Sequence, residues 1–241
     1  FNAADVIVVG RFAGSTSLAA VGSTTELLSL LTTLFIGFSI GANVNVARTL
    51  GNQDDQGTKD GIHTAVSVSI LSGSAMILLG FLFGRPMLQW MGTPADVIDK
   101  ASLYLMIIFI GMPSNMAYNF GSAILRAMGD TKRPLYFLSA AGVLNVVLNL
   151  IFVIVLHMDV AGVALATILS ETLSAILILN CLCRTDGPCH LNIRKLYIQK
   201  DQLIRMLRIG LPAGIQSGMF SFSNVLIQSS INSFGSVVMA G

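Results

Sequence analysis

Seven apolar stretches, each about as long as a membrane is thick, recur along this chain. The hydrocarbon core of a bilayer is about 30 Å thick, so a helix needs about 20 apolar residues to cross it. Backbone polar groups in lipid must be satisfied within the segment itself, which favours helices over loops. We therefore predict an all-α, polytopic membrane helical bundle. Its expected spans are residues 1–14, 26–47, 62–84, 101–124, 134–156, 161–183 and 210–234.

Composition agrees with a lipid environment. Hydrophobic residues make up 54% of the chain and charged residues only 11%, whereas soluble domains carry about 25% charged residues. The net charge is +2, and the basic residues are scattered between apolar blocks, so we expect no nucleic-acid partner. The sequence has no GxxxxGK[ST], HExxH or GxSxG motif, and we therefore expect neither an enzyme nor ATP-driven transport within this chain.

The placement of Lys and Arg predicts the orientation in the membrane. Counted on alternate sides of the expected spans, eleven of the 14 basic residues fall on one side and three on the other. Basic loops stay preferentially in the cytoplasm. We therefore expect a multi-pass protein of the plasma (inner) membrane, in contact with the lipid bilayer, with loops 48–61, 126–134 and 184–208 in the cytoplasm.

The spans suggest one lobe and the start of another. Because the chain opens at Phe1 without Met, we expect the first span to be truncated at its start. Residues 14–20 reappear loosely as residues 235–241, six spans later, and an even number of intervening spans predicts a parallel repeat. The expected units are a six-helix lobe (1–183), a cytoplasmic connector with an amphipathic helix along the interface (184–209), and the incomplete first helix of a second lobe (210–241).

Two ionisable residues fall within the expected spans, Asp5 and Glu171. Such groups are costly in lipid unless they are paired or wetted, and they usually mark functional sites. Each could exchange a proton, or ligate Na⁺ through oxygen. The alternatives are structural: Asp5 could pair with Arg11 near the interface, and Glu171 could form a packing hydrogen bond or an inward salt bridge.

Two pairs of polar residues share a helix face with these carboxylates or with each other. Asn145 and Asn149 are spaced i, i+4 in the fifth expected span, and Thr167 and Glu171 have the same spacing in the sixth. If these faces meet beside Asp5, their oxygens would enclose a site for a proton or a cation. The alternative is that the two Asn residues only hydrogen-bond neighbouring helices together.

Further polar residues could line a passage for a transported compound. They lie near Pro residues of the fourth and seventh expected spans, where a kink would open the bundle, although Pro also bends membrane helices without any such role. These passage candidates are Tyr118, Asn119, Gln216 and Gln228.

Several segments together resemble the multidrug and toxic compound extrusion (MATE) family of transporters. The most specific is the Arg126–Pro134 segment, RAMGDTKRP, which resembles the family's loop between the fourth and fifth spans. The likeness covers essentially the whole chain. The other segments are Asp5–Arg11 with Leu18–Gly22, Gly37–Gly51, Leu144–Asn145 with Asn149, and Gly162–Thr167.

The resemblance implies a protein of twelve spans in two six-helix lobes, monomeric at full length and without a cofactor. It would export small, cationic, amphipathic organic compounds in exchange for H⁺ or Na⁺. The family's first-lobe cation site matches Asp5, Asn145, Asn149 and Thr167, with no other metal site expected. The chain departs from the family at Asn149, where Asp is common. We hypothesise that Glu171, one turn from Thr167, restores the missing charge.

Two other functions compete with drug export. Flippases of the same superfamily move lipid-linked sugars, but their cavities are usually rich in Arg and Lys, which are absent well inside the later expected spans here. A non-transport membrane subunit, such as a channel or scaffold component, would use Asp5 and Glu171 only to hold helices together. Uphill export driven by a gradient would separate a carrier from both.

Overall fold

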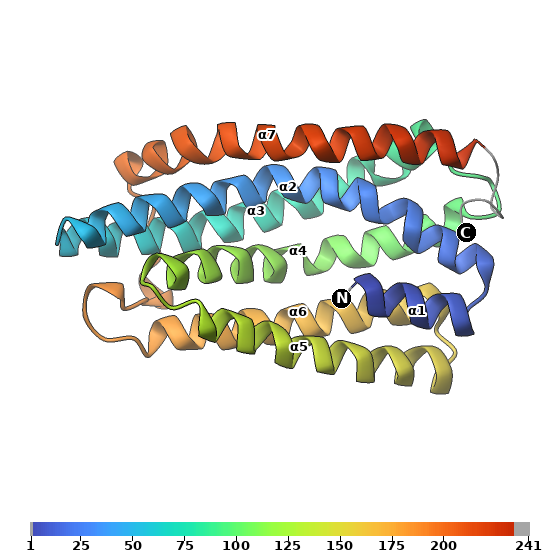
Figure 1. Ribbon diagram of the computed structural model, residues 1–241, viewed down its shortest axis with the longest axis horizontal. Coiled ribbons are helices and arrows are strands. Elements are labelled where there is room, and N and C mark those ends of the chain that lie inside the picture. The colour runs from blue at the N-terminus through green and yellow to red at the C-terminus, as the bar shows by residue number, and fades with distance from the viewer. Residues whose placement is uncertain (1, 234–241) are drawn as a thin grey trace.

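The computed structural model describes the backbone of residues 2–233 and the side chains of residues 5–233. This part of the chain forms a long bundle of seven α-helices, as predicted (Figure 1). The last residue of the seventh expected span and the second copy of the loose repeat, residues 235–241, lie outside the described residues. The helices are α1 (Asn2–Phe12), α2 (Ser15–Gly51), α3 (Asp55–Trp90), α4 (Ile98–Ala127), α5 (Lys132–Leu150), α6 (Asp159–Cys183) and α7 (Lys200–Asn232).

Five of the described helices are long and apolar enough to cross a membrane: α2, α3, α4, α6, and α5 together with the π-helical turn Ile151–Val155. Several are longer than the expected spans. Helix α2 has 37 residues and begins eleven positions before residue 26, where we expected the second span to start. At 1.5 Å per residue it is about 55 Å long, well beyond a hydrocarbon core of about 30 Å. Hydropathy therefore located the lipid-facing stretch but not the helix ends.

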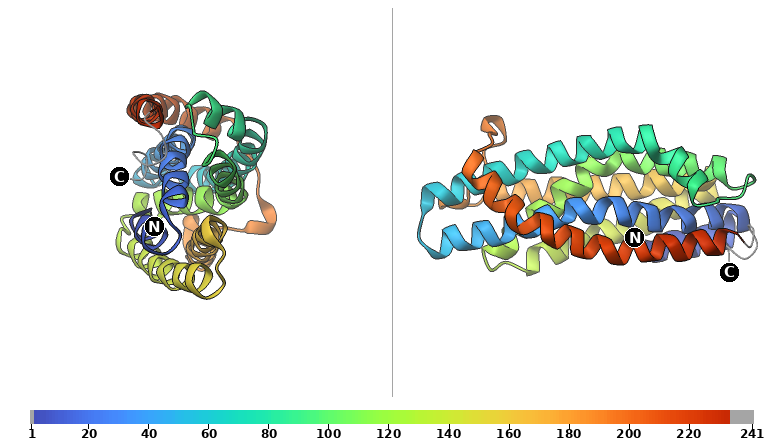
Figure 2. Two further views of the ribbon diagram at one scale, coloured as in Figure 1. Left: turned by 90° about the vertical axis from the view of Figure 1, so that its right-hand side faces the viewer. Right: turned by 90° about the horizontal axis from the view of Figure 1, so that it is seen from above.

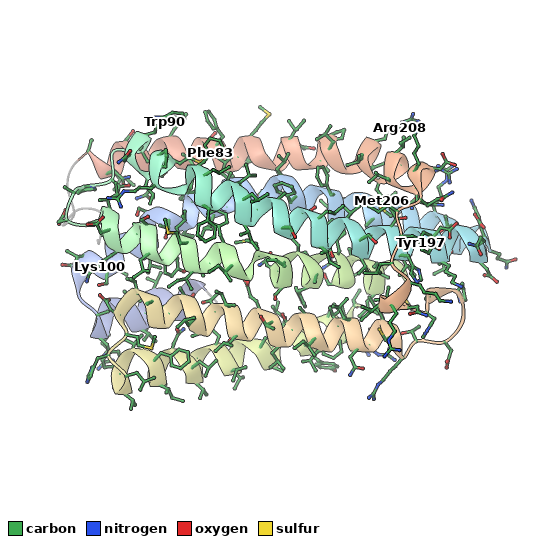
Figure 3. The ribbon with its side chains drawn as sticks, turned by 180° about the vertical axis from the view of Figure 1, so that it is seen from behind. Phe83, Trp90, Lys100, Tyr197, Met206 and Arg208 are labelled. Carbon is green, nitrogen blue, oxygen red and sulfur yellow. The ribbon has the colours of Figure 1, made fainter. Side chains whose placement is uncertain are left out.

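The two ends of the bundle differ in charge. Lys100 and Trp90 lie at one end, while Tyr197 and Arg208 lie at the opposite end (Figure 3). The alternating direction of α2 to α6 brings the α2–α3, α4–α5 and α6–α7 connections to the Tyr197 end. The three loops expected in the cytoplasm therefore lie at the same end, and most Lys and Arg residues with them.

Helix α4 occupies the centre of the bundle. It packs against α2, α3 and α6, while α5 covers the outer side of α6 and α7 covers α2 (Figures 1 and 2). The short helix α1 contacts α2, α5 and α6. Large apolar side chains such as Phe109 and Phe120 of α4 are fully buried in this core. The arrangement brings α1, α5 and α6 together on one side of the bundle.

The turn between α4 and α5 explains the RAMGDTKRP segment. Gly129 has a φ of +83°, a left-handed conformation that glycine adopts without steric cost after a helix end. Asp130 Oδ1 then accepts hydrogen bonds from the backbone N–H groups of Lys132 (3.2 Å) and Arg133 (3.1 Å), and its Oδ2 pairs with Arg133 Nε at 3.0 Å. The Asp side chain thus satisfies free donors at the start of α5.

The predicted amphipathic helix along the interface is wrong. Residues 184–199 contain only two short 3₁₀ turns, Gly187–Cys189 and Ile193–Lys195, and α7 begins at Lys200 instead of residue 210. The apolar residues that suggested the amphipathic helix pack inward: Met206 is buried against α2. Gln202 is buried too, and its Oε1 accepts a hydrogen bond from Asn45 at 2.7 Å. Bundle packing therefore extends α7 into the expected connector.

The connector is fixed to the end of α3. The Tyr197 ring stacks on His63, with ring centroids 5.2 Å apart, and its hydroxyl donates a hydrogen bond to Asp60. Thr64 Oγ1 accepts the backbone N–H of Gln199 at 3.0 Å. Partial burial and the hydrogen bond to Asp60 raise the pKa of Tyr197 to about 12, so its phenol remains a donor at cellular pH.

Glycines bring α2 and α7 into close contact. A Cβ on Gly37 would overlap the backbone of Gly214, and a Cβ on Gly41 would overlap the carbonyl oxygen of Met206. Small residues with this four-residue spacing let membrane helices approach closely. We call the contact formed by Gly37, Gly41, Gly210 and Gly214 the glycine seam.

Candidate functional site: a buried carboxylate beside an acidic cavity

Asp5 of α1 is fully buried where α1, α5 and α6 meet. Asn149 Nδ2 donates a hydrogen bond to Asp5 Oδ1 at 2.6 Å, and Thr167 Oγ1 donates to Asp5 Oδ2 at 3.1 Å. Arg11, the structural partner that we considered for Asp5, is exposed. No salt bridge to Asp5 forms among the described residues. Neutral groups therefore provide the hydrogen bonds to this carboxylate.

Asn145 links the two donors. Its Nδ2 donates to Thr167 Oγ1 at 3.3 Å, and its Oδ1 accepts from Asn149 Nδ2 at 3.3 Å. Both Asn residues are fully buried. We call Asp5, Asn145, Asn149 and Thr167 the Asp5 cluster. The structure thus brings together four of the five residues that we assigned to a cation or proton site.

One polar atom of the Asp5 cluster has no partner. Asn149 Oδ1 is buried without a hydrogen bond, although its Nδ2 is used twice. A buried acceptor left without a donor is costly. Carboxylate, amide and hydroxyl oxygens are also the ligands that hard cations prefer. The chemistry of this donor set, with one unused amide oxygen, fits a small cation or a proton carried by Asp5.

The positions of the cluster residues follow from helix geometry. The i, i+4 spacing puts Asn145 and Asn149 on the face of α5 that packs against α6, whereas their neighbours Val146 and Val147 are exposed. Directly after this face, the helix changes to the π-helical turn Ile151–Val155. Such turns occur frequently at functional sites.

An acidic cavity adjoins the Asp5 cluster. It has a volume of about 370 Å³ and is lined by residues of α2, α4, α6 and α7. Thr167 lines this cavity and also donates to Asp5, so the two sites share a side chain. The lining includes two carboxylates, Glu26 and Glu171, and contains no Lys, Arg or His.

Glu171 belongs to the acidic cavity by its contacts. Its Oε1 accepts a hydrogen bond from Asn115 Nδ2 at 2.8 Å. It lies one turn from Thr167 on α6 but forms no described hydrogen bond with Asp5, Asn145 or Asn149. The two carboxylates, Asp5 and Glu171, therefore occupy neighbouring but different surroundings.

Sequence reasoning missed Glu26, Asn115 and Tyr104. Glu26 coincided with the expected start of the second span and was therefore taken as a boundary residue, whereas α2 begins at Ser15 and places Glu26 well inside the helix. Asn115 follows Pro113 in α4 and was passed over for Asn119. Polar residues near a predicted span end deserve the same attention as those at its middle.

The passage candidates separate into two groups. Tyr118 and Asn119 line a second cavity of about 310 Å³ that also includes Glu171. By contrast, Gln216 is exposed, and Gln228 donates to Asn232 Oδ1 at 3.0 Å. Neither Gln lines the two cavities described here; Asn224 is the residue of α7 that lines the acidic cavity.

Comparison with known proteins identifies relatives. The MatE family model matches residues 1–151, more than half of the chain. The chain is 31% identical over 245 residues to the probable multidrug resistance protein YpnP of Bacillus subtilis (strain 168), covering 100% of this chain and 54% of YpnP. It is 29% identical over 238 residues to the probable multidrug resistance protein YoeA of the same organism, covering 96% of this chain and 51% of YoeA.

Solved structures share the fold. The structure of the MATE multidrug transporter DinF-BH, solved in complex with a drug ligand, matches 99% of this chain with a TM-score of 0.92 at 21% identity, over 54% of that protein. The chain spans about half the length of the relatives it matches. The helical bundle, the carboxylate within it and the match of the MatE model over most of the bundle lead to one conclusion: this chain belongs to the MatE family of membrane transporters.

Proposed function

We propose that the full-length protein exports small organic cations by antiport with H⁺ or Na⁺, and that the Asp5 cluster carries the coupling ion. One observation supports this most strongly: Asp5 is fully buried and is hydrogen-bonded by the neutral side chains of Asn149 and Thr167. An isolated buried carboxylate is stable only when it is neutralised. A proton or a small cation would neutralise it and could leave again when the site opens.

Two ions remain candidates for coupling. A proton needs only Asp5, because the amide and hydroxyl donors of the cluster can reorient around a neutral acid. Sodium needs several oxygens, and the cluster offers both carboxylate oxygens, the hydroxyl of Thr167 and the unused Oδ1 of Asn149. Asn149 supplies one negative charge less than the Asp common in the family, which lowers the expected affinity for Na⁺.

The acidic cavity supports a cationic cargo. Its carboxylates, Glu26 and Glu171, meet no basic residue in the lining, so the local potential attracts cations and repels phosphates. This argues against a lipid-linked sugar flippase. YoeA and YpnP are described as probable multidrug resistance proteins, and DinF-BH was solved with a drug ligand bound. We therefore propose a fluorescent organic cation, ethidium, as a first test cargo.

The proposal includes a topology. Residues 2–183 would form the first lobe and the protein would be a monomer in the bacterial cell membrane, with loops 48–61, 126–134 and 184–208 in the cytoplasm. Helix α7 would be the first helix of the second lobe. Because relatives are about twice as long, transport would require the rest of the protein.

The test is gradient-driven efflux by the full-length protein. Vesicles loaded with ethidium would be given an H⁺ or a Na⁺ gradient, and efflux would be compared between the parent and Asp5→Asn. We expect one gradient to drive export in the parent and neither to drive it in the variant. Asp96→Asn is the matched control, because Asp96 is an exposed carboxylate outside both sites. If neither gradient moves cargo in a folded parent, drug export is rejected.

A further inference from the structure

We propose that the acidic cavity selects organic dications, with Glu26 taking one positive charge and Glu171 the other. The inference deepens the proposed function and rests on it for the direction of transport. It assigns these two carboxylates to the cargo, whereas the Asp5 cluster serves the coupling ion.

The first step is that both carboxylates lack a cationic partner. Among the described residues, no hydrogen bond or ion pair reaches Glu26, although it is partly buried in α2. Glu171 accepts one hydrogen bond, from Asn115, and retains acceptor capacity on its carboxylate. A carboxylate that is removed from water without a counter-charge is costly within a membrane. Two such groups facing one cavity favour a ligand that carries two positive charges.

The second step is the distance between the two charges. Glu171 lines the second cavity together with Thr32 and Ile36 of α2, so it lies level with that part of the helix. Glu26 precedes these residues by six and ten positions on α2. At 1.5 Å per residue, Glu26 and Glu171 are offset by roughly 9–15 Å along the bundle. A ligand that meets both must therefore hold its charges about that far apart.

The third step is the chemistry of the wall between them. Leu28, Ile108 and Met112 line the acidic cavity, together with the ring of Tyr104. These groups suit an apolar linker, and the thioether of Met112 can adapt to linkers of different shape. A volume of about 370 Å³ lies within the usual range for small-molecule sites. An elongated dication with an apolar middle matches this cavity better than a compact one.

A set of dications of increasing length tests the inference by binding. The probes are bis-trimethylammonium ions linked by ethane, hexane or decane, with hexyltrimethylammonium and decyltrimethylammonium as single-charge controls. Thermal stabilisation of the purified full-length protein over a range of ligand concentrations gives each affinity. We expect the hexane- or decane-linked dication to bind about tenfold more tightly than its single-charge control, and the ethane-linked ion to lose this advantage.

Substitutions identify the residues responsible. In Glu26→Gln we expect the dication advantage to fall by about tenfold, while affinity for the single-charge controls changes less than about twofold. Unchanged binding of these controls also shows that the variant is folded. Glu171→Gln should lower the same advantage, and Asp96→Asn should leave it intact.

Other results would overturn the inference. Equal affinities for dications and single-charge ions, or preference for the ethane-linked ion, would exclude two separated anionic contacts. A Glu171→Gln variant that binds dications like the parent but loses gradient-driven efflux of every cargo would assign Glu171 to coupling instead. Because affinity is measured without a gradient, a Glu26-dependent dication preference stands even if the protein fails to export ethidium, and that failure would count against antiport alone.

Discussion

Asp5 and Glu26 are both carboxylates within the helical bundle, but their surroundings differ in almost every respect. Asp5 is fully buried, and both of its oxygens accept hydrogen bonds from neutral donors. Glu26 is partly exposed to a cavity of about 370 Å³ and has no described partner. A closed, pre-arranged site suits a small ion that must be held and released. An open, unpartnered charge suits a larger cargo that brings its own counter-charge.

The largest effect is expected at Asp5. Asp5→Asn removes the only ionisable group of the Asp5 cluster, so no proton or cation charge can be exchanged there, while the amide keeps the volume and hydrogen bonding. We expect gradient-driven efflux of every cargo to fall to background. Binding of dications to the purified protein should stay within about twofold, because the acidic cavity keeps both carboxylates. Loss of binding together with transport would show that the two sites are one.

The glycine seam allows the acidic cavity to be changed from a distance. Gly41→Ala would push α7 away from α2, because its Cβ overlaps the carbonyl oxygen of Met206. Such overpacking typically costs about 1–3 kcal/mol. Since α7 lines the acidic cavity through Asn224 but forms no part of the Asp5 cluster, cargo affinity should fall and ion dependence should persist.

Gly22→Ala is the matched control for this change. Gly22 lies in the same helix, but a Cβ there meets no neighbouring atom within 4 Å. Alanine is favoured over glycine in a helix by up to about 1 kcal/mol, so this variant should keep or raise the melting temperature while Gly41→Ala lowers it. Equal melting temperatures for the two variants would contradict the close contact at the seam.

A third change alters the identity of the ion. Asn149→Asp places a second carboxylate beside Asp5, where Asn149 Nδ2 now donates at 2.6 Å. Two carboxylates this close cannot both stay charged without a cation between them. We expect efflux to become more dependent on Na⁺ or to require a proton shared by the pair. Thermal stabilisation by NaCl, compared with choline chloride at equal ionic strength, measures the first outcome; no change in either dependence would remove Asn149 from the ion site.

The smallest effect is expected at Thr167. Thr167→Val keeps the shape of the side chain but removes the hydroxyl that donates to Asp5 Oδ2 and accepts from Asn145. One hydrogen bond of this kind is worth about 1 kcal/mol, or about a fivefold change in an equilibrium constant. We expect the ion concentration for half-maximal efflux to rise by about that factor, with dication affinity unchanged. Thr172→Val is a suitable control, because Thr172 lies on the same helix and bonds only Ser114 among the described residues.

Much of the fold was predictable from one-dimensional patterns. Apolar length predicted seven helical segments, and all seven helices form in the described residues. Helix ends were less predictable. The helix α7 extends to Lys200 because Gln202 and Met206 pack against α2, a contact between residues more than 150 positions apart. Hydropathy along a chain carries no information about such a contact.

The candidate site divides in the same way. Helical spacing alone places Asn145 and Asn149 on one face of α5, and the cost of charge in lipid alone marks Asp5 and Glu171 as unusual. The resemblance to MATE transporters linked Asp5 with Thr167 before any contact was known. No pattern indicated Glu26, whose importance depends entirely on which residues of α4 and α6 lie opposite it.

The sequence by itself determined a polytopic helical bundle, the expected sides of its basic loops, and the residues whose polarity lipid makes expensive. These properties depend on local spacing and on transfer from water to hydrocarbon, which each segment experiences separately. Only the tertiary structure decided that Asp5 is enclosed by Asn149 and Thr167 while Glu171 joins Glu26 in a cavity. The physical reason is that the rotation and approach of each helix are set by close packing against its neighbours, including the glycine seam, and packing is a property of the whole bundle.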